Sequence, residues 1–325
     1  MDSHYYQPKN EKVFIAAGII GLILIVMVVL FIYSKNQYIR IDDIKTPIAE
    51  TEETERVFAE GKPFDNLILT AKATVVWDVS NKKLIFQKNE KDILPLASLT
   101  KLMTALVAIE LLPRQSTIRI AKEYLEEENG AGLLADERWN SDDLISLTLL
   151  TSSNVGARAI ATVAGAFLPP NDKTSNPRGL FVKRLNRRAA DLGLISMRYY
   201  NDGGLDIDKE RGGAYGNARD VAILMDHILN NYPELLEPTK HLEREIISAD
   251  KVSHNFRNTN EKAVTIPGAI GSKTGFTDLA QGNLAVAFSP GLEGPFIAVV
   301  LGSTFDGRFA DMDKLVSATL KTLAQ

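Results

Sequence analysis

One uncharged stretch of the sequence, residues 13–33, limits the possible architecture more than any other feature. These 21 positions contain no Asp, Glu, Lys or Arg. As a helix rising about 1.5 Å per residue, they would extend roughly 30 Å, which is the thickness of the hydrocarbon core of a bilayer. A buried helix or a cleaved signal peptide is the alternative, but a signal has a shorter apolar core followed by small residues. Ser34, Lys35 and Asn36 follow here, so we expect an uncleaved transmembrane anchor.

This anchor divides the rest of the chain into three parts. We expect residues 1–12 to form a cytoplasmic tail, residues 34–62 a polar and acidic linker, and residues 63–325 one folded domain. Two lysines precede the anchor and three basic residues follow it by position 45. These flanking charges therefore give no clear orientation by the positive-inside rule.

The composition excludes several classes of protein. The net charge is −4, from 37 basic and 41 acidic residues, whereas nucleic-acid-binding proteins usually carry a basic excess. The chain has no cysteine, which rules out thiol catalysis, disulfides and cysteine-based zinc sites. The four histidines lie far apart in no metal-binding pattern, at His4, His227, His241 and His254. We expect no metal, no cofactor and no nucleic acid as a partner.

The folded domain begins and ends with short β-rich segments that enclose a helical region. Such an order predicts an α+β fold, in which the N-terminal and C-terminal strands meet in one antiparallel sheet with flanking helices and a helical insert. The expected strands are residues 73–79, 84–88, 269–276, 283–288 and 296–302. The expected helices are residues 98–111, 141–150 (with Ser141 as the N-cap), 155–163, 181–192, 218–230 (with Asn217 as the N-cap) and 310–323.

Three short motifs carry possible chemistry: S-x-x-K at Ser98 and Lys101, S-x-N at Ser152 and Asn154, and K-T-G from Lys273. The first two are weak when taken alone, because each occurs elsewhere. S-x-x-K recurs at Ser80 and Ser248, and S-x-N at Ser34 and Ser253, whereas K-T-G occurs once. An ordinary surface serine is the better interpretation of each isolated copy.

The setting of Ser98 distinguishes it from the other serines. Ser98 opens a helix and Lys101 follows one turn later, so both side chains lie on the same face. The helix is apolar nearly all round, and burial lowers the pKa of a lysine until it becomes a usable base near neutral pH. A serine hydroxyl needs such a neighbour to become a nucleophile. The helix N–H groups also point at the negative charge that would develop there.

The other two motifs have both a structural and a functional interpretation. Ser152 and Asn154 lie between two predicted helices, where a turn could present them to a cleft or where a serine could simply cap a helix. Lys273 and Thr274 lie in a predicted strand and could hold a carboxylate. Gly275 would let a substrate backbone approach closely. The alternative for Lys273 is an edge-strand lysine that discourages aggregation.

The order S-x-x-K, S-x-N, K-T-G is that of penicillin-binding proteins and class A β-lactamases. Beyond the motifs, the sequence resembles low-molecular-mass serine D-alanyl-D-alanine carboxypeptidases over roughly residues 65 to 325. The similar segments include the helix that carries Ser98 and the hairpin before it. They are residues 75–78, 95–106, 201–205, 218–220, 258–260 and 271–278.

The resemblance implies a β-lactamase/transpeptidase-like fold and a reaction in two steps. Ser98 would attack the carbonyl between the two terminal D-alanines of a peptidoglycan stem peptide, and Lys101 would take its proton. Ser152 and Asn154 would line the cleft and relay protons or bind the peptide. Water would then hydrolyse the acyl-enzyme without a metal or an organic cofactor, and β-lactams would be covalent inhibitors.

The same resemblance assigns the K-T-G strand to substrate binding. Lys273 and Thr274 would hold the terminal carboxylate beside Gly275. The backbone N–H groups of Ser98 and Phe276 would form the oxyanion hole. This chemistry would place the domain on the outer side of the cell membrane, to which residues 13–33 would anchor it as a single span.

Two departures and three alternatives qualify the resemblance. Val155 follows Asn154 where relatives have Asp, and Phe276 follows K-T-G where many have His, which leaves the substrate preference open.

A class A β-lactamase also needs a glutamate after S-x-N, and none occurs between Glu137 and Glu210. A D,D-endopeptidase would use the same machinery, and a catalytically silent module that binds the wall or senses β-lactams is the non-enzymatic alternative.

Overall fold

The computed structural model describes residues 63–170, 176–291 and 293–324. The chain divides into two compact units, Met1–Ala59 and Glu60–Gln325. The predicted tail, anchor and linker (residues 1–12, 13–33 and 34–62) lie outside the described residues. Within the described ranges, no helix has the length and hydropathy of a membrane span.

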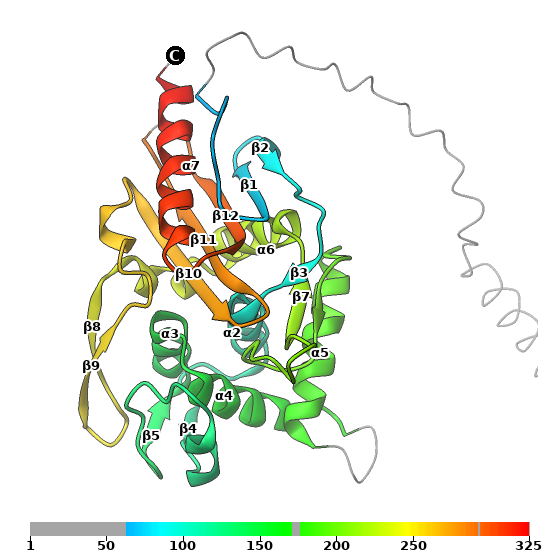
Figure 1. The fold of residues 1–325 in the computed structure, drawn as a ribbon. Coiled ribbons are helices and arrows are strands. Elements are labelled where there is room, and N and C mark those ends of the chain that lie inside the picture. The colour runs from blue at the N-terminus through cyan, green and yellow to red at the C-terminus, as the bar shows by residue number, and fades with distance from the viewer. Residues whose placement is uncertain (1–62, 171–175, 292, 325) are drawn as a thin grey trace, which may run out of the picture. The chain divides into compact units, whose positions relative to one another are not determined.

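A five-stranded antiparallel sheet forms the centre of the second unit (Figure 1). Its first and last strands in sequence lie side by side, with Ala73 opposite Leu301 and Asp78 opposite Phe296. The prediction that the terminal strands meet in one antiparallel sheet is therefore confirmed. In spatial order the strands are β10 (Ala269–Thr277), β11 (Gln281–Phe288), β12 (Phe296–Ser303), β1 (Ala73–Asp78) and β2 (Lys83–Lys88).

Alternating side chains on β1 place this sheet between two hydrophobic cores. Val75 and Trp77 belong to the larger core, on the side of helices α2 (Thr100–Leu111) and α6 (Ala218–Asn231). Val76 belongs to the smaller core, whose helix is α7 (Gly307–Leu323). Because successive residues of a strand point to opposite faces, a strand that is buried on both faces reads as an unbroken apolar run.

The remaining helices form the insert between β2 and β10. They are α3 (Ser141–Thr151), α4 (Asn154–Ala166) and α5 (Pro177–Asp191). Asn217 caps α6 as predicted, since its Oδ1 accepts a bond of 2.7 Å from Asp220 N. The predicted cap of α3 was wrong by one position: Asn140 Oδ1, and not Ser141, accepts from Asp142 N at 3.0 Å. Both residue types are good caps, so the sequence pattern does not separate neighbours.

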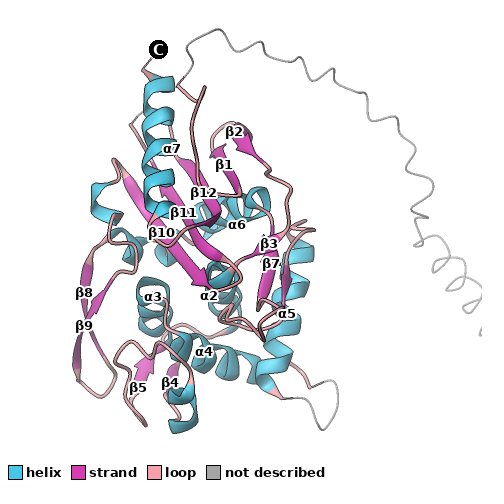
Figure 2. Cartoon of the chain, viewed as in Figure 1, coloured by secondary structure: helices cyan, strands magenta, loops and turns pink. Residues whose placement is uncertain are grey.

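Short elements complete the fold, and the sequence did not predict them (Figure 2). They contain two to five residues each, which is too short for a periodic pattern. Three small sheets join β3 (Leu94–Pro95), β6 (Arg198–Tyr199) and β7 (Ala214–Gly216); β4 (Thr117–Arg119) and β5 (Arg138–Asn140); and β8 (Glu243–Ile247) and β9 (Ser253–Arg257). The short 3-10 helices are η2 (Ala97–Leu99), η3 (Lys122–Glu126), η4 (Pro233–Leu235), η5 (Glu237–Lys240) and η6 (Ala263–Thr265).

Asp311 ties α7 to the start of the domain. Its fully buried carboxylate accepts bonds from Thr70 N (3.0 Å), Ala71 N (2.8 Å) and Ser303 Oγ (2.8 Å). We expect Asp311→Ala to lower the free energy of unfolding by about 2–3 kcal/mol, because three donors lose their acceptor and two of these bonds are buried. Urea unfolding of this variant and of Asp313→Ala, an exposed aspartate on the same helix, measures the difference. Equal losses in both variants would contradict this role of Asp311.

Candidate active site

Ser98 is the middle residue of the 3-10 turn η2, and α2 begins two residues later at Thr100. The preceding residue, Ala97, has φ 47°, in the left-handed region that alanine rarely adopts. Leu96 N bonds to Ala214 O at 2.9 Å, which holds this turn against the small β3–β7–β6 sheet. Ser98 is half-buried while its neighbours Ala97 and Leu99 are buried. The strained turn therefore presents one hydroxyl to the cleft, and strain of this kind is commonly found at functional sites.

Lys101 is fully buried at the base of this turn. Its Nζ lies 2.9 Å from Ser98 Oγ, 2.7 Å from Asn154 Oδ1 and 2.8 Å from Gly203 O. Burial lowers the pKa of Lys101 from 10.5 to about 7, against the opposing effect of the Asp202 and Glu127 carboxylates. A substantial fraction of this lysine is therefore neutral near pH 7.

The neighbours of Lys101 also fix where its lone pair points. A neutral amine has two N–H bonds and one lone pair. Asn154 Oδ1 and Gly203 O can only accept hydrogen bonds, so they use both N–H groups. The lone pair then faces Ser98 Oγ, the only contact of the three that can donate a proton. The geometry thus suits transfer of the Ser98 proton to Lys101.

The S-x-N motif lies at the junction of α3 and α4. Ser152 adopts φ 59° at the end of α3, and Asn154 is the first residue of α4. Ser153 between them caps α4, since its Oγ accepts from Gly156 N at 3.0 Å. The capping interpretation therefore holds for Ser153. The bend leaves Asn154 in contact with Lys101 and Ser152 in contact with Lys273.

Strand β10 carries the K-T-G motif along the other side of the cleft. Lys273 is buried, and its Nζ donates to Ser152 Oγ and to Thr274 O, both at 2.8 Å. Burial, together with the charges of Lys101 and Arg308, holds the pKa of Lys273 well below its ordinary value. The hydroxyls of Thr274 and Thr259 are 2.6 Å apart. Lys273 lies on an edge strand, as the alternative interpretation required, but it points inward and not to solvent.

Gly275 allows β10 to pass against the turn that holds Ser98. A Cβ at this position would lie 3.0 Å from Leu96 O and 3.2 Å from Ser98 N. The next residue, Phe276, is 41% exposed. By these contacts Ser98, Lys101 and Asn154 lie together, Ser152 and Thr274 contact Lys273, and Gly275 lies against the turn of Ser98. Phe276 follows Gly275 on β10, and its ring packs edge-on against that of Phe305, with the centroids 5.2 Å apart.

Four charged residues around this cleft were not assigned a role from the sequence. Arg308 of α7 donates from Nη1 to Gly275 O at 3.0 Å and is almost fully buried. Arg178 joins Glu127 (Nη1 to Oε1, 3.1 Å) to Asp202 (Nε to Oδ1, 2.6 Å). Asp202 falls in one of the segments that carried the resemblance. Nothing in the sequence marked Glu127, Arg178 or Arg308: Glu127 lies in the acidic run Glu126–Glu128, and each arginine is the second residue of an ordinary helix.

Metal coordination does not explain these charges. Among residues 63–170, 176–291 and 293–324, no group of three or more His, Cys, Asp or Glu side chains could hold a metal ion. The acidic residues near the cleft are bound to arginines instead.

Solved structures with a similar fold are penicillin-binding proteins and related enzymes. Penicillin-binding protein D2 from Listeria monocytogenes, in a cefotaxime-bound form, matches with a TM-score of 0.65 and 26% identity, over 78% of this chain and 98% of that one. A mutant of the Streptomyces K15 DD-transpeptidase matches with a TM-score of 0.68 over 80% of this chain and 100% of that one, at 21% identity. The fold and the serine–lysine cleft therefore define a transpeptidase-like protein of the penicillin-binding class.

The family follows from the sequence match. The family model described as D-alanyl-D-alanine carboxypeptidase matches residues 59–304, and the chain belongs to that family. D-alanyl-D-alanine carboxypeptidase DacF of Bacillus subtilis is 28% identical over 260 residues, which are 79% of this chain and 64% of that protein. A D-alanyl-D-alanine endopeptidase of Pseudomonas aeruginosa is 29% identical over 217 residues, 65% of each chain. The chain thus spans less than two thirds of the length of these two relatives.

Proposed function

We propose that this protein is a serine D-alanyl-D-alanine carboxypeptidase that removes the terminal D-alanine from peptidoglycan stem peptides. The observation that carries the proposal is the contact set of Lys101. Its two carbonyl partners leave the lone pair for Ser98 Oγ, 2.9 Å away. Membership of the D-alanyl-D-alanine carboxypeptidase family supports the substrate class.

Acylation follows from this geometry. Lys101 takes the proton of Ser98 while Oγ attacks the carbonyl carbon between the two D-alanines. The N–H groups of Ser98 and Phe276 stabilise the oxyanion, since β10 lies directly against the serine turn. Ser152, bonded to Lys273, relays a proton to the departing amine of D-alanine. Water then releases the shortened peptide from Ser98.

Substrate binding in this proposal depends on β10. Thr274 donates to the terminal carboxylate, and the positive charge of Arg308 beneath Gly275 favours an anion there. Lys273 adds a cation when it is protonated. Asn154, whose Oδ1 is bound to Lys101, has its amide nitrogen available for a peptide carbonyl. The same site would accept β-lactams as covalent inhibitors, and the cefotaxime-bound and ampicillin-bound structures of the Listeria relative support β-lactam binding.

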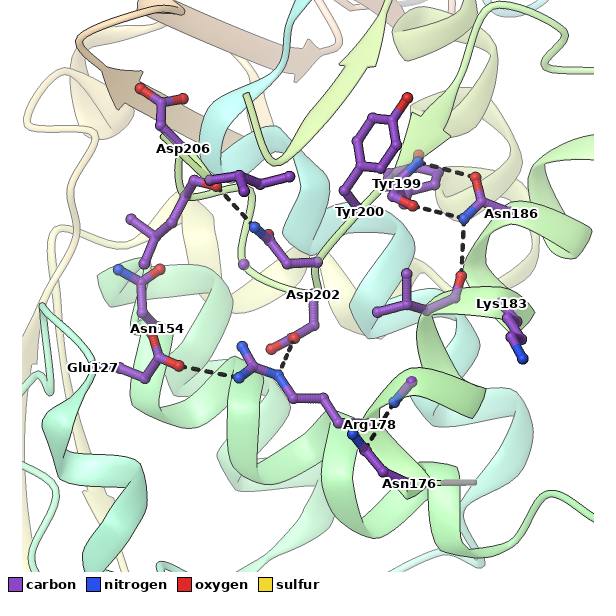
Figure 3. Close-up of a pocket in the computed structure, with 16 residues that line it drawn as sticks. Glu127, Asn154, Asn176, Arg178, Lys183, Asn186, Tyr199, Tyr200, Asp202 and Asp206 are labelled. Atoms are coloured by element: carbon purple, nitrogen blue, oxygen red, sulfur yellow. Dashed lines mark hydrogen bonds and ion pairs between the residues drawn. The ribbon is translucent and has the colours of Figure 1, made fainter. Parts of the chain in front are cut away.

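A D,D-endopeptidase is the second candidate. The relatives from Pseudomonas aeruginosa, Haemophilus influenzae and Escherichia coli that are named D-alanyl-D-alanine endopeptidases support it, at 27–29% identity. The two activities differ in the amine that leaves: free D-alanine, or the cross-linking amino group of a neighbouring stem peptide. A class A-like β-lactamase is less well supported: Glu127, which lines the same cavity as Asn154 (Figure 3), is the glutamate that would have to act as the base. Arg158 and Arg178 both donate to its Oε1, which disfavours a base role.

One experiment separates these functions. Residues 60–325 are incubated in parallel with a peptide ending in D-Ala-D-Ala, with cross-linked muropeptides and with benzylpenicillin. Release of free D-alanine from the first is the expected result. Cleavage of cross-links alone would indicate the endopeptidase, and rapid turnover of benzylpenicillin the β-lactamase. No reaction and no covalent adduct would indicate a silent module and contradict the proposal.

The pH dependence of acylation tests the base. Since the pKa of Lys101 is about 7 and the neutral form takes the proton, we expect the rate of penicillin acylation to fall about tenfold per pH unit below pH 7. Above that pH the rate should level off. Stopped-flow measurement between pH 5 and 9, with circular dichroism as a check on folding, gives the profile. A rate independent of pH across this range would argue against Lys101 as the base.

The site also has to reach the cell wall. We therefore propose that residues 13–33 cross the cell membrane once, that residues 34–62 link the anchor to the catalytic domain (residues 63–325), and that this domain lies outside the cytoplasm. The support is the length of the uncharged stretch and the location of the substrate class. Protease added to intact spheroplasts should digest the domain and leave a membrane-bound N-terminal fragment. Full protection of the domain would contradict this orientation.

A further inference from the structure

The segment Asn258–Asn260, which follows β9 in the chain, joins the two sides of the cleft. On one side, Asn260 Nδ2 donates to Ser272 Oγ of β10 at 2.9 Å. On the other side, Thr259 N donates to Leu150 O, near the end of α3, at 3.1 Å. The segment is among those that resemble the carboxypeptidase family, but the chemistry of the reactive serine and the two lysines gives it no role.

Two buried asparagines hold Thr259 in place. Asn258 is 4% exposed, and its Nδ2 donates to Thr239 O at 2.7 Å and to His241 O at 2.8 Å. Asn260, which is 1% exposed, is bound to β10 on the other side of Thr259. Because both neighbours are fixed by buried hydrogen bonds, the position of the Thr259 side chain relative to β10 is fixed as well.

The hydroxyl of Thr259 has two neighbours that can accept its proton. Its Oγ1 lies 2.6 Å from Thr274 Oγ1 and 3.5 Å from Leu150 O. Thr274 is buried, and within residues 63–170, 176–291 and 293–324 no other hydrogen bond involves its Oγ1. The hydroxyl that the proposed function assigns to the substrate carboxylate therefore depends on Thr259 alone.

The two distances determine which hydroxyl donates. Each hydroxyl carries one proton. If Thr274 donated to Thr259, the proton of Thr259 would have to go to Leu150 O, and 3.5 Å is beyond the usual range of an O–H···O bond. If Thr259 donates to Thr274, the short bond of 2.6 Å is made and the proton of Thr274 stays available to the cleft. The geometry therefore favours Thr259 as the donor.

This direction matters for the end of the substrate. A carboxylate has only acceptors, so Thr274 can bind it only as a donor. A hydroxyl that already accepts a hydrogen bond also donates more strongly, because successive bonds polarise one another. A chain of bonds from Thr259 to Thr274 to the carboxylate satisfies both conditions.

We propose that Thr259 is a positioning residue for substrate binding, whose hydroxyl donates to Thr274 Oγ1 and so directs the Thr274 proton to the terminal carboxylate. This inference rests on the proposed function and adds a determinant of its specificity, the preference for a free carboxylate over an uncharged end. The charge of Arg308 attracts any anion, whereas the pair of threonines selects a group that accepts a hydrogen bond at this point.

The test uses the purified full-length protein and two peptides: acetyl-L-Ala-D-Ala-D-Ala, and the same peptide with a C-terminal amide. The native protein should prefer the acid by at least about tenfold in kcat/KM, as for a hydrogen bond to a charged group. Thr259→Val keeps the shape of the side chain and removes its hydroxyl. It should raise KM for the acid about five- to tenfold with kcat little changed, because this contact is made equally before and during the reaction. The KM for the amide should change much less.

Two further variants are the controls. Thr259→Ser keeps the hydroxyl and should restore KM for the acid to within about threefold of the native value. Thr148→Val, on α3, removes another buried hydroxyl, one that has no hydrogen-bond partner among the described residues. It should leave both KM values unchanged.

The possible outcomes are distinct. Equal losses with both peptides in Thr259→Val would mean a purely structural role and overturn the inference, as would a Thr259→Ser variant no better than Thr259→Val. If the native protein releases D-alanine without preferring the acid, the inference fails and the proposed function stands. If the native protein cleaves neither peptide, the proposed function itself fails, and the inference with it.

Discussion

Ser98→Ala should abolish the covalent reaction with penicillin, with an acylation rate at least about 10⁴-fold below that of the native protein. Among the described serines that begin an S-x-x-K pattern, Ser98 alone is half-buried in a strained turn with a lysine Nζ 2.9 Å from its Oγ. Removing Oγ leaves no nucleophile for Lys101 to activate. Mass spectrometry of the intact protein after exposure to benzylpenicillin should show no added mass.

A second serine supplies the matched control for this experiment. Ser80 begins another S-x-x-K copy, with Lys83, but it is exposed in the turn between β1 and β2. Ser80→Ala should acylate at the native rate, and peptide mapping of the native protein should place the adduct on the peptide that contains Ser98. An adduct that persists in Ser98→Ala would mean that the nucleophile is elsewhere.

Lys101→Arg should fold and yet acylate about 10²–10⁴-fold more slowly, which is the usual loss when a general base is removed. The guanidinium keeps the positive charge but does not lose a proton in proteins. Lys101 sits in a fully buried space, so the larger side chain also needs a check on folding by circular dichroism. Lys101→Met, an apolar side chain of similar length, provides the second variant and should lose activity to the same extent. Near-normal acylation in either variant would show that the proton goes to another group.

Lys273→Arg should behave differently from Lys101→Arg. In the proposed mechanism Lys273 contributes a contact to Ser152 and, when it is protonated, a positive charge, and a guanidinium can supply both. We expect a loss of about tenfold in kcat/KM for the peptide, mainly through KM, with acylation by small reactive esters largely retained. Measuring both variants with the same ester and the same peptide separates the base from the binding group. If Lys101→Arg and Lys273→Arg lost the same activity with the ester and with the peptide, the two lysines would not have the separate roles proposed here.

The sequence predicted the parts of the fold that have a strong local pattern. The apolar runs of β1 and β12 and the near-continuous apolar helix α2 were visible because burial on both sides leaves no polar positions. The pairing of the first and last strands followed from the order of the elements. Ser98 and Lys101 stood out because a lysine one turn into an otherwise apolar helix is unusual, and Lys273 stood out because K-T-G occurs once in the sequence.

The features that the sequence did not reveal depend on contacts between distant segments. Ala97, with its unusual φ, follows Leu96, whose N–H is bonded to Ala214 O on β7, a strand more than a hundred positions later in the sequence. Glu127, Arg178 and Asp202 come from three separate elements and meet only in the folded chain. A single charge on a helix or in a loop carries no sign of its partner, so spacing within the sequence could not identify this network.

The pairing of β1 with β12 has a consequence for how the protein is made. The reactive serine lies on the segment after β2, yet the sheet that supports it is complete only when Phe296–Ser303 pairs with Ala73–Asp78. Contacts between residues so far apart form late and slowly. During synthesis, the segment with Ser98 leaves the ribosome well before its sheet partner exists. An unfinished chain therefore lacks the complete sheet behind Ser98, and we expect Ser98 to become reactive only after the last strand has joined the first.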